Sequence, residues 1–306
     1  MGDPLPEVDR SPRRWPALVA IAGAVVFVAA MLLPYETLTG PPPRDVAIID
    51  LAEPARVWAP LALAPVAVLV TAAAGALLLA TDRWAPHRAA GMLTGAGVWA
   101  ALRGASLVGV ATLPGGSLGP SVDPSVGSFL ALAGGGAVLV AGVTVFTRSP
   151  DEVGARSRVV AGLTIVGAVG YALAQLIPAA RQRTPGFETA DLSLVDPASP
   201  DLVLLWEALL PAVVTVILLL AGMRILTGTA GGTGALVMAI GVITTLQFTG
   251  IALWATNDAL FLSPAPGAFL GIGTGLVLLL AGLLSPTEPA APGPEPSPAT
   301  LASEPD

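Results

Sequence analysis

The chain contains no cysteine, no lysine and a single histidine. Without cysteine it cannot form a disulfide framework, present a thiolate nucleophile or bind a metal through thiolates. The histidine, His87, lies beside Arg83 and Arg88 in the segment DRWAPHR. We interpret it as part of a basic cluster that helps to set membrane topology, and not as a metal ligand.

Charged residues are scarce as well. Only 11% of the 306 residues are charged and 54% are hydrophobic, with a mean hydropathy of +0.79, whereas soluble domains carry about 25% charged residues. The net charge of −7 indicates no particular partner, because several acids lie in the Pro-rich C-terminal tail: Glu288, Glu295, Glu304 and Asp306. We expect a membrane protein whose partner is the lipid bilayer, and no nucleic-acid binding.

The motifs of common enzymes are missing too. The sequence has no H-E-x-x-H, no G-x-S-x-G and no P-loop, and its glycine-rich runs lie inside hydrophobic segments. Carboxylates in the loops lack the spacing of an EF-hand. We therefore expect a protein that is not an enzyme and that has no cofactor and no metal site.

What the chain does have is long hydrophobic runs. A hydrocarbon core of ~30 Å requires about 20 apolar residues per helix. This length predicts eight transmembrane helices, in an all-α integral membrane protein, near residues 15–35, 58–80, 89–112, 127–147, 159–178, 203–226, 234–256 and 267–284.

Arginine predicts the orientation. With the N-terminus in the cytoplasm, inner segments hold Arg10, Arg13, Arg14, Arg83, Arg88, Arg148, Arg156, Arg158 and Arg224, and outer loops hold Arg44, Arg56, Arg181 and Arg183. Cytoplasmic loops are enriched in basic residues, so both termini are expected inside. The use of arginine alone, with abundant Ala, Gly, Val and Pro, is typical of a GC-rich bacterial genome. We expect a multi-pass protein of a bacterial plasma membrane.

One segment of the chain occurs twice. Residues 21–34 (IAGAVVFVAAMLLP) return as residues 165–178 (IVGAVGYALAQLIP), at a spacing of 144. Shorter matches continue through the following spans, so each unit contains four of them. Because four is an even number, the two units point the same way, and we expect a tandem parallel 4+4 repeat with its axis along the membrane normal.

The repeat also bears on how the chain is divided. Arg13 and Arg14 before an apolar run could mark a cleaved signal, but the run is longer than usual and its copy at 165–178 cannot be one. We therefore expect the first span to be retained. The expected segments are a cytoplasmic N-terminal segment (1–14), a first four-helix repeat (15–147), a cytoplasmic linker (148–158), a second four-helix repeat (159–284) and a disordered Pro-rich tail (285–306).

Small residues recur at helical spacing in matched spans. In a membrane such residues allow helices to approach closely, and they serve either packing within a bundle or an exposed dimerisation face. We favour packing inside each bundle. The positions are Gly91, Gly95, Gly127, Ala131, Gly135, Gly267, Gly271 and Gly275.

A few polar residues lie inside the spans. Arg103 is expected about 13 Å deep, and the matched position in the second repeat is Gln247. Glu207, about one turn into its span, is the nearest acid. An intramembrane charge costs roughly 2.5–3.5 kcal/mol and is read first as functional. A structural pair of Arg103 with Glu207 that locks two helices is the alternative, which we favour.

Two functions of different class remain open. The first is a non-enzymatic accessory or scaffold protein of the cell envelope, which meets a protein partner through the outer loops 36–57 and 179–202. The second is a small-solute transporter or exporter with a site at the repeat interface near Arg103. The duplication is compatible with both.

Overall fold

A computed structural model of the chain describes residues 11–39, 44–47, 62–81, 86–111, 121–148, 156–183, 189–195, 201–228, 232–256 and 262–285. Most of the predicted N-terminal segment, most of the inner linker and the Pro-rich tail from residue 286 lie outside these residues.

Each predicted span contains one helix. The eight helices in the described residues are α1 (Ser11–Ala30), α3 (Leu63–Thr81), α4 (Pro86–Ala111), α5 (Val126–Arg148), α6 (Arg158–Leu176), α7 (Asp201–Thr227), α8 (Thr233–Trp254) and α9 (Pro266–Leu283). Six of them (α3, α5, α6, α7, α8 and α9) are long and apolar enough to cross a membrane. The protein is therefore a helical membrane protein, as its composition predicts.

Helices α1 and α4 are not among these six helices, for different reasons. Helix α1 has 20 residues, but its sequence begins with SPRR and its apolar run starts only at Trp15. The predicted span ran on to residue 35, but the helix ends at Ala30 and an extended strand begins at Pro34. Helix α4 has ample length at 26 residues, and the charge of Arg103 together with its several glycines lowers its hydropathy.

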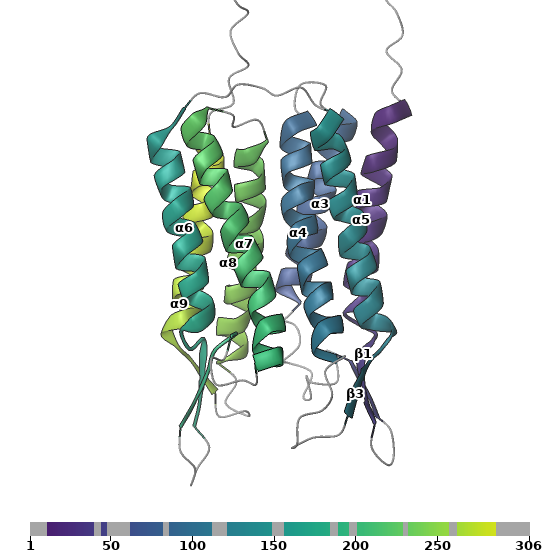
Figure 1. Ribbon diagram of the computed structural model, residues 1–306, viewed down its shortest axis with the longest axis vertical. Helices are drawn as coiled ribbons and strands as arrows, with labels where there is room; N and C mark the ends of the chain where they lie inside the picture. Colours follow the sequence, from purple (N-terminus) through teal and green to yellow (C-terminus); the bar gives the residue numbers. More distant parts are fainter. Residues whose placement is uncertain are drawn as a thin grey trace, which may run out of the picture.

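Two small antiparallel sheets complete the fold. The first joins β1 (Pro34–Thr39), β2 (Arg44–Ala47) and β3 (Ser121–Pro124) in the order β2-β1-β3, and the second joins β4 (Ala180–Gln182), β5 (Ala190–Leu192) and β6 (Leu262–Pro264) in the order β5-β4-β6. The expectation of an all-α fold is therefore incomplete, although the predicted spans themselves are helical. Both sheets lie at one end of the helices, opposite the start of α1 and the end of α9 (Figure 1).

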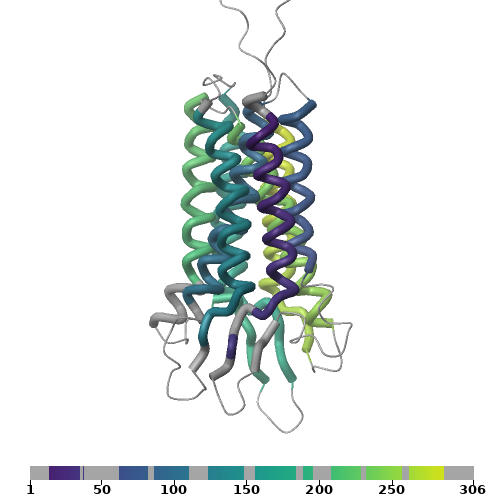
Figure 2. Tube along the Cα trace, turned by 90° about the vertical axis from the view of Figure 1, so that its right-hand side faces the viewer, coloured from purple at the N-terminus to yellow at the C-terminus, as the bar shows by residue number. Residues whose placement is uncertain are grey.

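The helices form two rings of four. In the first bundle the contacts run α1–α3–α4–α5 and back to α1, and in the second they run α6–α7–α8–α9 and back to α6. The bundles meet through α4 and α8, with further contacts of α3 with α8 and of α4 with α7. All eight helices run along one axis (Figure 1, Figure 2).

The buried core continues from one bundle into the other. Phe27 and Trp99 of the first bundle and Tyr171 and Ile243 of the second belong to one cluster of buried residues. Large apolar side chains are exposed on the outer faces of the helices, among them Val140, Val166, Leu220 and Leu276. Exposed apolar surface on this scale is what a helix presents to lipid.

Close backbone contact joins α4 to α8. A Cβ atom added at Gly95 would lie 2.9 Å from both Ala239 Cβ and Leu236 O, and one added at Gly91 would strike Gly232 O. Gly232, just before α8, has φ +67° and lies against the carbonyl of His87. Gly91 and Gly95 thus pack between the bundles, and neither inside one bundle nor on an exposed face.

The other predicted small residues lie within their bundles. Gly127 lies against the carbonyl of Pro34, Ala131 is fully buried, and Gly135 packs on the backbone of Ala100. In the second bundle Gly267 meets the carbonyl of Ile177, Gly271 lies against the ring of Phe248, and Gly275 meets Thr245. These contacts agree with the packing interpretation of the six positions.

Substitution of Gly95 by alanine should destabilise the protein. The added Cβ would meet Ala239 Cβ and a backbone carbonyl, which cannot move aside as a flexible side chain can. We expect the free energy of unfolding in detergent to fall by about 1–3 kcal/mol, the usual cost of overpacking. Gly136→Ala is the matched control, because a Cβ at Gly136 meets nothing within 4 Å. An unchanged thermal midpoint in Gly95→Ala would contradict the close α4–α8 contact.

Candidate functional site

Arg103 projects from α4 with its side chain exposed. It lies eight residues before the end of α4 nearest the sheets, hence about 12 Å from that end at ~1.5 Å per residue. Helix α4 contacts α7 and α8 of the second bundle.

Of the two other predicted site residues, the structure describes the side chain of Gln247 but not that of Glu207. Gln247 lies on α8, is partly buried, and its Oε1 atom is buried with no hydrogen-bond partner among the described residues. The backbone of Glu207 belongs to α7, but its side chain lies outside the described part of the structure. The predicted pairing of Arg103 with Glu207 therefore stays a prediction.

Among the described residues of the second bundle, three further buried side chains have unpartnered polar atoms; Thr244 is one of the threonines that flank Gln247 in the sequence, whereas the sequence interpretation missed Tyr171 and Gln175. Tyr171 is fully buried, Gln175 is 3% exposed and Thr244 is fully buried. Their polar atoms, Tyr171 OH, Gln175 Nε2 and Thr244 Oγ1, have no hydrogen-bond partner among the described residues. In the first bundle Thr94 Oγ1 and Trp99 Nε1 are likewise buried without a hydrogen-bond partner among the described residues. Buried polar atoms in native proteins are nearly always paired with protein or water, so both bundles have polar groups in their interior.

The corresponding positions of the first bundle are largely apolar. At 144 residues before Tyr171, Gln175, Thr244 and Gln247 the sequence has Phe27, Met31, Ala100 and Arg103. Phe27 meets Trp99 edge-on across the first bundle, with ring centroids 6.4 Å apart and planes at 79°. The position matching Trp99 is Ile243. The aligned repeat thus contained a signal for the missed residues: polar side chains in one copy where the other is apolar.

These side chains lie toward the end of the second bundle that carries its sheet. Gln175 is one residue, and Tyr171 five residues, from the last residue of α6. Gln247 and Thr244 are seven and ten residues from the last residue of α8. At ~1.5 Å per residue the set extends to a depth of about 15 Å below the helix ends.

The second sheet is attached by backbone hydrogen bonds to the helix ends nearest these polar side chains. The amide of Val195 donates to the carbonyl of Gln175 at 3.0 Å, and the amide of Ala179 donates to Leu192 O at 2.8 Å. The amide of Gly267, at the start of α9, donates to Pro178 O at 2.8 Å. These backbone bonds tie the sheet to both α6 and α9.

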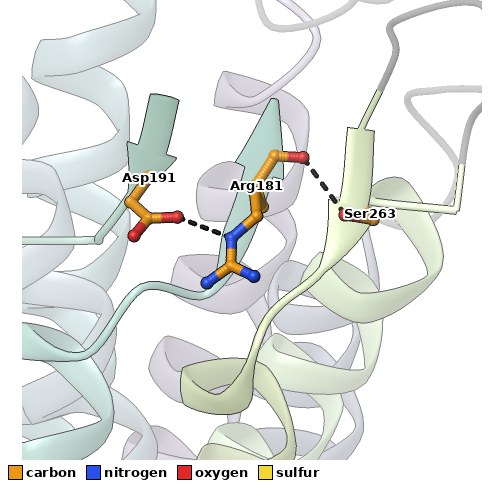
Figure 3. Close-up of polar contacts among 3 residues, drawn as sticks. All are labelled: Arg181, Asp191 and Ser263. Atoms are coloured by element: carbon orange, nitrogen blue, oxygen red, sulfur yellow. Dashed lines mark hydrogen bonds and ion pairs between the residues drawn. The ribbon is translucent and has the colours of Figure 1, made fainter. Parts of the chain in front are cut away.

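Polar side chains mark the exposed surface of that sheet. Arg181 Nε donates to Asp191 Oδ1 at 2.8 Å across β4 and β5, and Ser263 Oγ donates to the carbonyl of Arg181 at 3.4 Å from β6 (Figure 3). Both charged side chains are well exposed, at 39% and 51%. Arg181 therefore contacts both neighbouring strands through polar groups that remain accessible to partners.

At the opposite end the bundles are joined by basic residues. Arg224 of α7 lies over the ring of Phe146 of α5, 5.6 Å from its centroid. His87, interpreted from the sequence as part of a basic cluster in an inner turn, is buried at the start of α4. Among the described residues there is no group of three or more His, Cys, Asp or Glu side chains that could hold a metal ion.

Removal of the Arg181–Asp191 ion pair should change stability little. Exposed ion pairs contribute about 0–1 kcal/mol, because water screens the charges and the side chains lose entropy. We expect Asp191→Ala to lower the free energy of unfolding by less than about 1 kcal/mol, measured by thermal unfolding in detergent at low and high salt. A larger, salt-insensitive loss would mean that Asp191 is enclosed by other parts of the chain.

The comparisons with known proteins add no family. Neither a family model, nor a curated protein, nor a solved structure matches this chain. The functional argument therefore depends on the geometry of its residues.

Proposed function

We propose that the chain is a tandem parallel 4+4 repeat whose eight helices all cross a bacterial plasma membrane, with both termini in the cytoplasm. Three observations support this. The two sheets have the same strand order, and the two rings have the same helix order. The contacts between bundles are reciprocal: α3 meets α8 and α7 meets α4. Gly95 faces Ala239, the position 144 residues later, as residues beside a two-fold axis do.

Within this architecture, the function we favour is a non-enzymatic accessory or scaffold protein of the cell envelope. The observation that carries it is the pair of sheets, one per bundle, held at the same end of the helices. Backbone hydrogen bonds tie the second sheet to α6 and α9. A rigid helical base that presents two small polar sheets suits contact with an envelope protein through segments 36–57 and 179–202.

A second candidate, a small-solute transporter or exporter, is supported by Arg103. The side chain is exposed on α4, which contacts α8 of the second bundle, and α8 carries the matched polar residue Gln247. Sites of parallel-repeat transporters lie at the interface between the repeats.

The proposed topology can be tested with single cysteines, because the chain has none of its own. Arg183 and Thr147 are exposed residues near opposite ends of the helices. We expect Arg183→Cys to react with a membrane-impermeant maleimide in intact cells, and Thr147→Cys to react only after permeabilisation. The reverse pattern would invert the topology.

A photo-crosslinking amino acid placed in the second sheet can distinguish the scaffold function from the transporter function. At Ala190, exposed on β5, it should yield one discrete heavier adduct in intact cells. At Val166, exposed on the apolar face of α6, it should not.

Solute accumulation in vesicles tests the transporter function directly. If Arg103→Gln and Glu207→Gln each leave folding intact and abolish accumulation, while no sheet position gives an adduct, the scaffold proposal fails. If both variants lose abundance and the double variant recovers it, the pair is structural and the transporter loses its main support.

A further inference from the structure

Arginine occupies matched places at the start of the first helix in each bundle. Arg14 lies in the first turn of α1 and Arg158 begins α6, 144 residues later, and both side chains are exposed. Each of these helices leads into a strand, so both begin at the end of the bundles opposite the sheets (Figure 1). The two bundles therefore present a guanidinium group at the same level of the structure.

A large apolar side chain beside each arginine faces outward. Trp15 is 71% exposed and Val159 is 70% exposed. Leu18 and Val166 continue the exposed apolar surface along α1 and α6. Tryptophan is enriched where the hydrocarbon of a bilayer meets the headgroups. This pattern places the two arginines at headgroup level, with apolar side chains next to them at the level of the acyl chains.

Hydrogen bonds fix the position of Arg158. Ser157 Oγ accepts a hydrogen bond from the amide of Val160 at 3.3 Å and so caps α6. The residue before the cap, Arg156, is exposed and donates from Nε to the carbonyl of Thr227, at the end of α7, at 3.2 Å. The start of α6 thereby holds two exposed guanidinium groups beside the end of α7.

The segments that link the helices at this end are positively charged even when all their carboxylates are counted. Eight arginines and three acidic residues lie in residues 11–14, 81–88, 148–158 and 224–232. The linking segments at the sheet end have the opposite balance, with four arginines and nine acidic residues in residues 31–62, 112–125, 177–200 and 255–265. Ion pairs within the segments near Arg14 and Arg158 therefore leave a net positive charge.

A guanidinium group beside an apolar surface favours one class of ligand. Arginine forms charge-assisted hydrogen bonds with phosphate oxygens, and basic residues beside membrane helices attract the headgroups of anionic lipids. A free phosphate ion would contact the arginine alone. A phospholipid also covers the neighbouring apolar side chain, because its acyl chains lie along the helix.

We propose that each bundle binds the headgroup of an anionic phospholipid, such as phosphatidylglycerol, at the start of its first helix. At the first site Arg14 contacts the phosphate and Trp15 contacts the acyl chains. At the second site Arg156 and Arg158 contact the phosphate and Val159 contacts the acyl chains. The inference goes beyond the proposed function and does not rest on it, because the two sites are the same whichever side of the membrane this end faces.

Lipid retention by the full chain tests the two sites. The detergent-solubilised protein is mixed with equal amounts of phosphatidylglycerol and phosphatidylcholine that have identical acyl chains, and bound lipids are counted by native mass spectrometry. We expect the wild-type chain to retain phosphatidylglycerol in preference. Arg14→Gln and Arg158→Gln should each weaken binding at one site by about fivefold, the effect of one basic residue at an anionic surface. The double variant should show the loss at both sites.

Arg183→Gln is the matched control, because Arg183 is an exposed arginine near the sheets. It removes the same charge and should leave lipid retention unchanged, and Arg14→Lys should retain most of the binding because lysine keeps the charge. A loss in Arg183→Gln as large as in Arg14→Gln would mean that only the total charge matters, and would overturn the proposal. Equal retention of both lipids by the wild-type chain, as expected if the seven acidic residues of segments 1–10 and 286–306 neutralise these arginines, would overturn it as well.

Thermal unfolding separates lipid binding from folding. Without added lipid the double variant should keep the wild-type thermal midpoint, since both side chains are exposed. Phosphatidylglycerol should raise the midpoint of the wild-type chain more than phosphatidylcholine does, because a ligand of the folded state stabilises it, and the double variant should lose this difference. If millimolar inorganic phosphate abolished the preference for phosphatidylglycerol, the sites would bind free phosphate and the proposal would fail.

Discussion

The backbones of α4 and α8 approach each other at Gly91, Gly95 and Gly232 more closely than any side chain would allow. In lipid the hydrophobic effect drives helices together only weakly, so the stability of such a contact depends on close packing of atoms. Around this one contact each bundle retains its own ring of helices, and a single core runs through both. The contacts of α3 with α8 and of α4 with α7 also join the two bundles.

The two bundles share a design but differ in what they enclose. The first packs Phe27 against Trp99, and the Nε1 atom of Trp99 is buried without a hydrogen-bond partner among the described residues. The second has Tyr171 and Ile243 at the matched positions, and Tyr171 OH is also buried without such a partner among the described residues. The two halves therefore keep one arrangement of helices although the side chains between the helices differ.

Much of the helical structure could be predicted from hydropathy, because a span of apolar residues has one stable arrangement in a bilayer. The ends of the first helix in each half were less accurate, since α1 ends at Ala30 and α6 at Leu176, before Pro34 and Pro178, which the predicted spans included. The sheets could not be predicted in the same way. Strand β4 has three residues and pairs with β6, some 80 residues later, and so short a segment has too little pattern to specify its partner. Arg103 and Gln247 stood out as polar residues in apolar spans. Tyr171 and Gln175 did not, since each is ordinary in a helix and unusual only by comparison with Phe27 and Met31.

The strand pairing within each half connects segments that the helices alone would leave separate. In the first half β1 follows α1 directly and pairs with β3, which leads into α5; in the second half β4 and β6 connect α6 and α9 in the same way. A force applied to either sheet is therefore transmitted to both the first and the last helix of that half, because the hydrogen bonds between the strands connect them. Relative motion of these two helices is restrained at the sheet end, so the two helices can separate more easily at the opposite end, which the sheets do not reach.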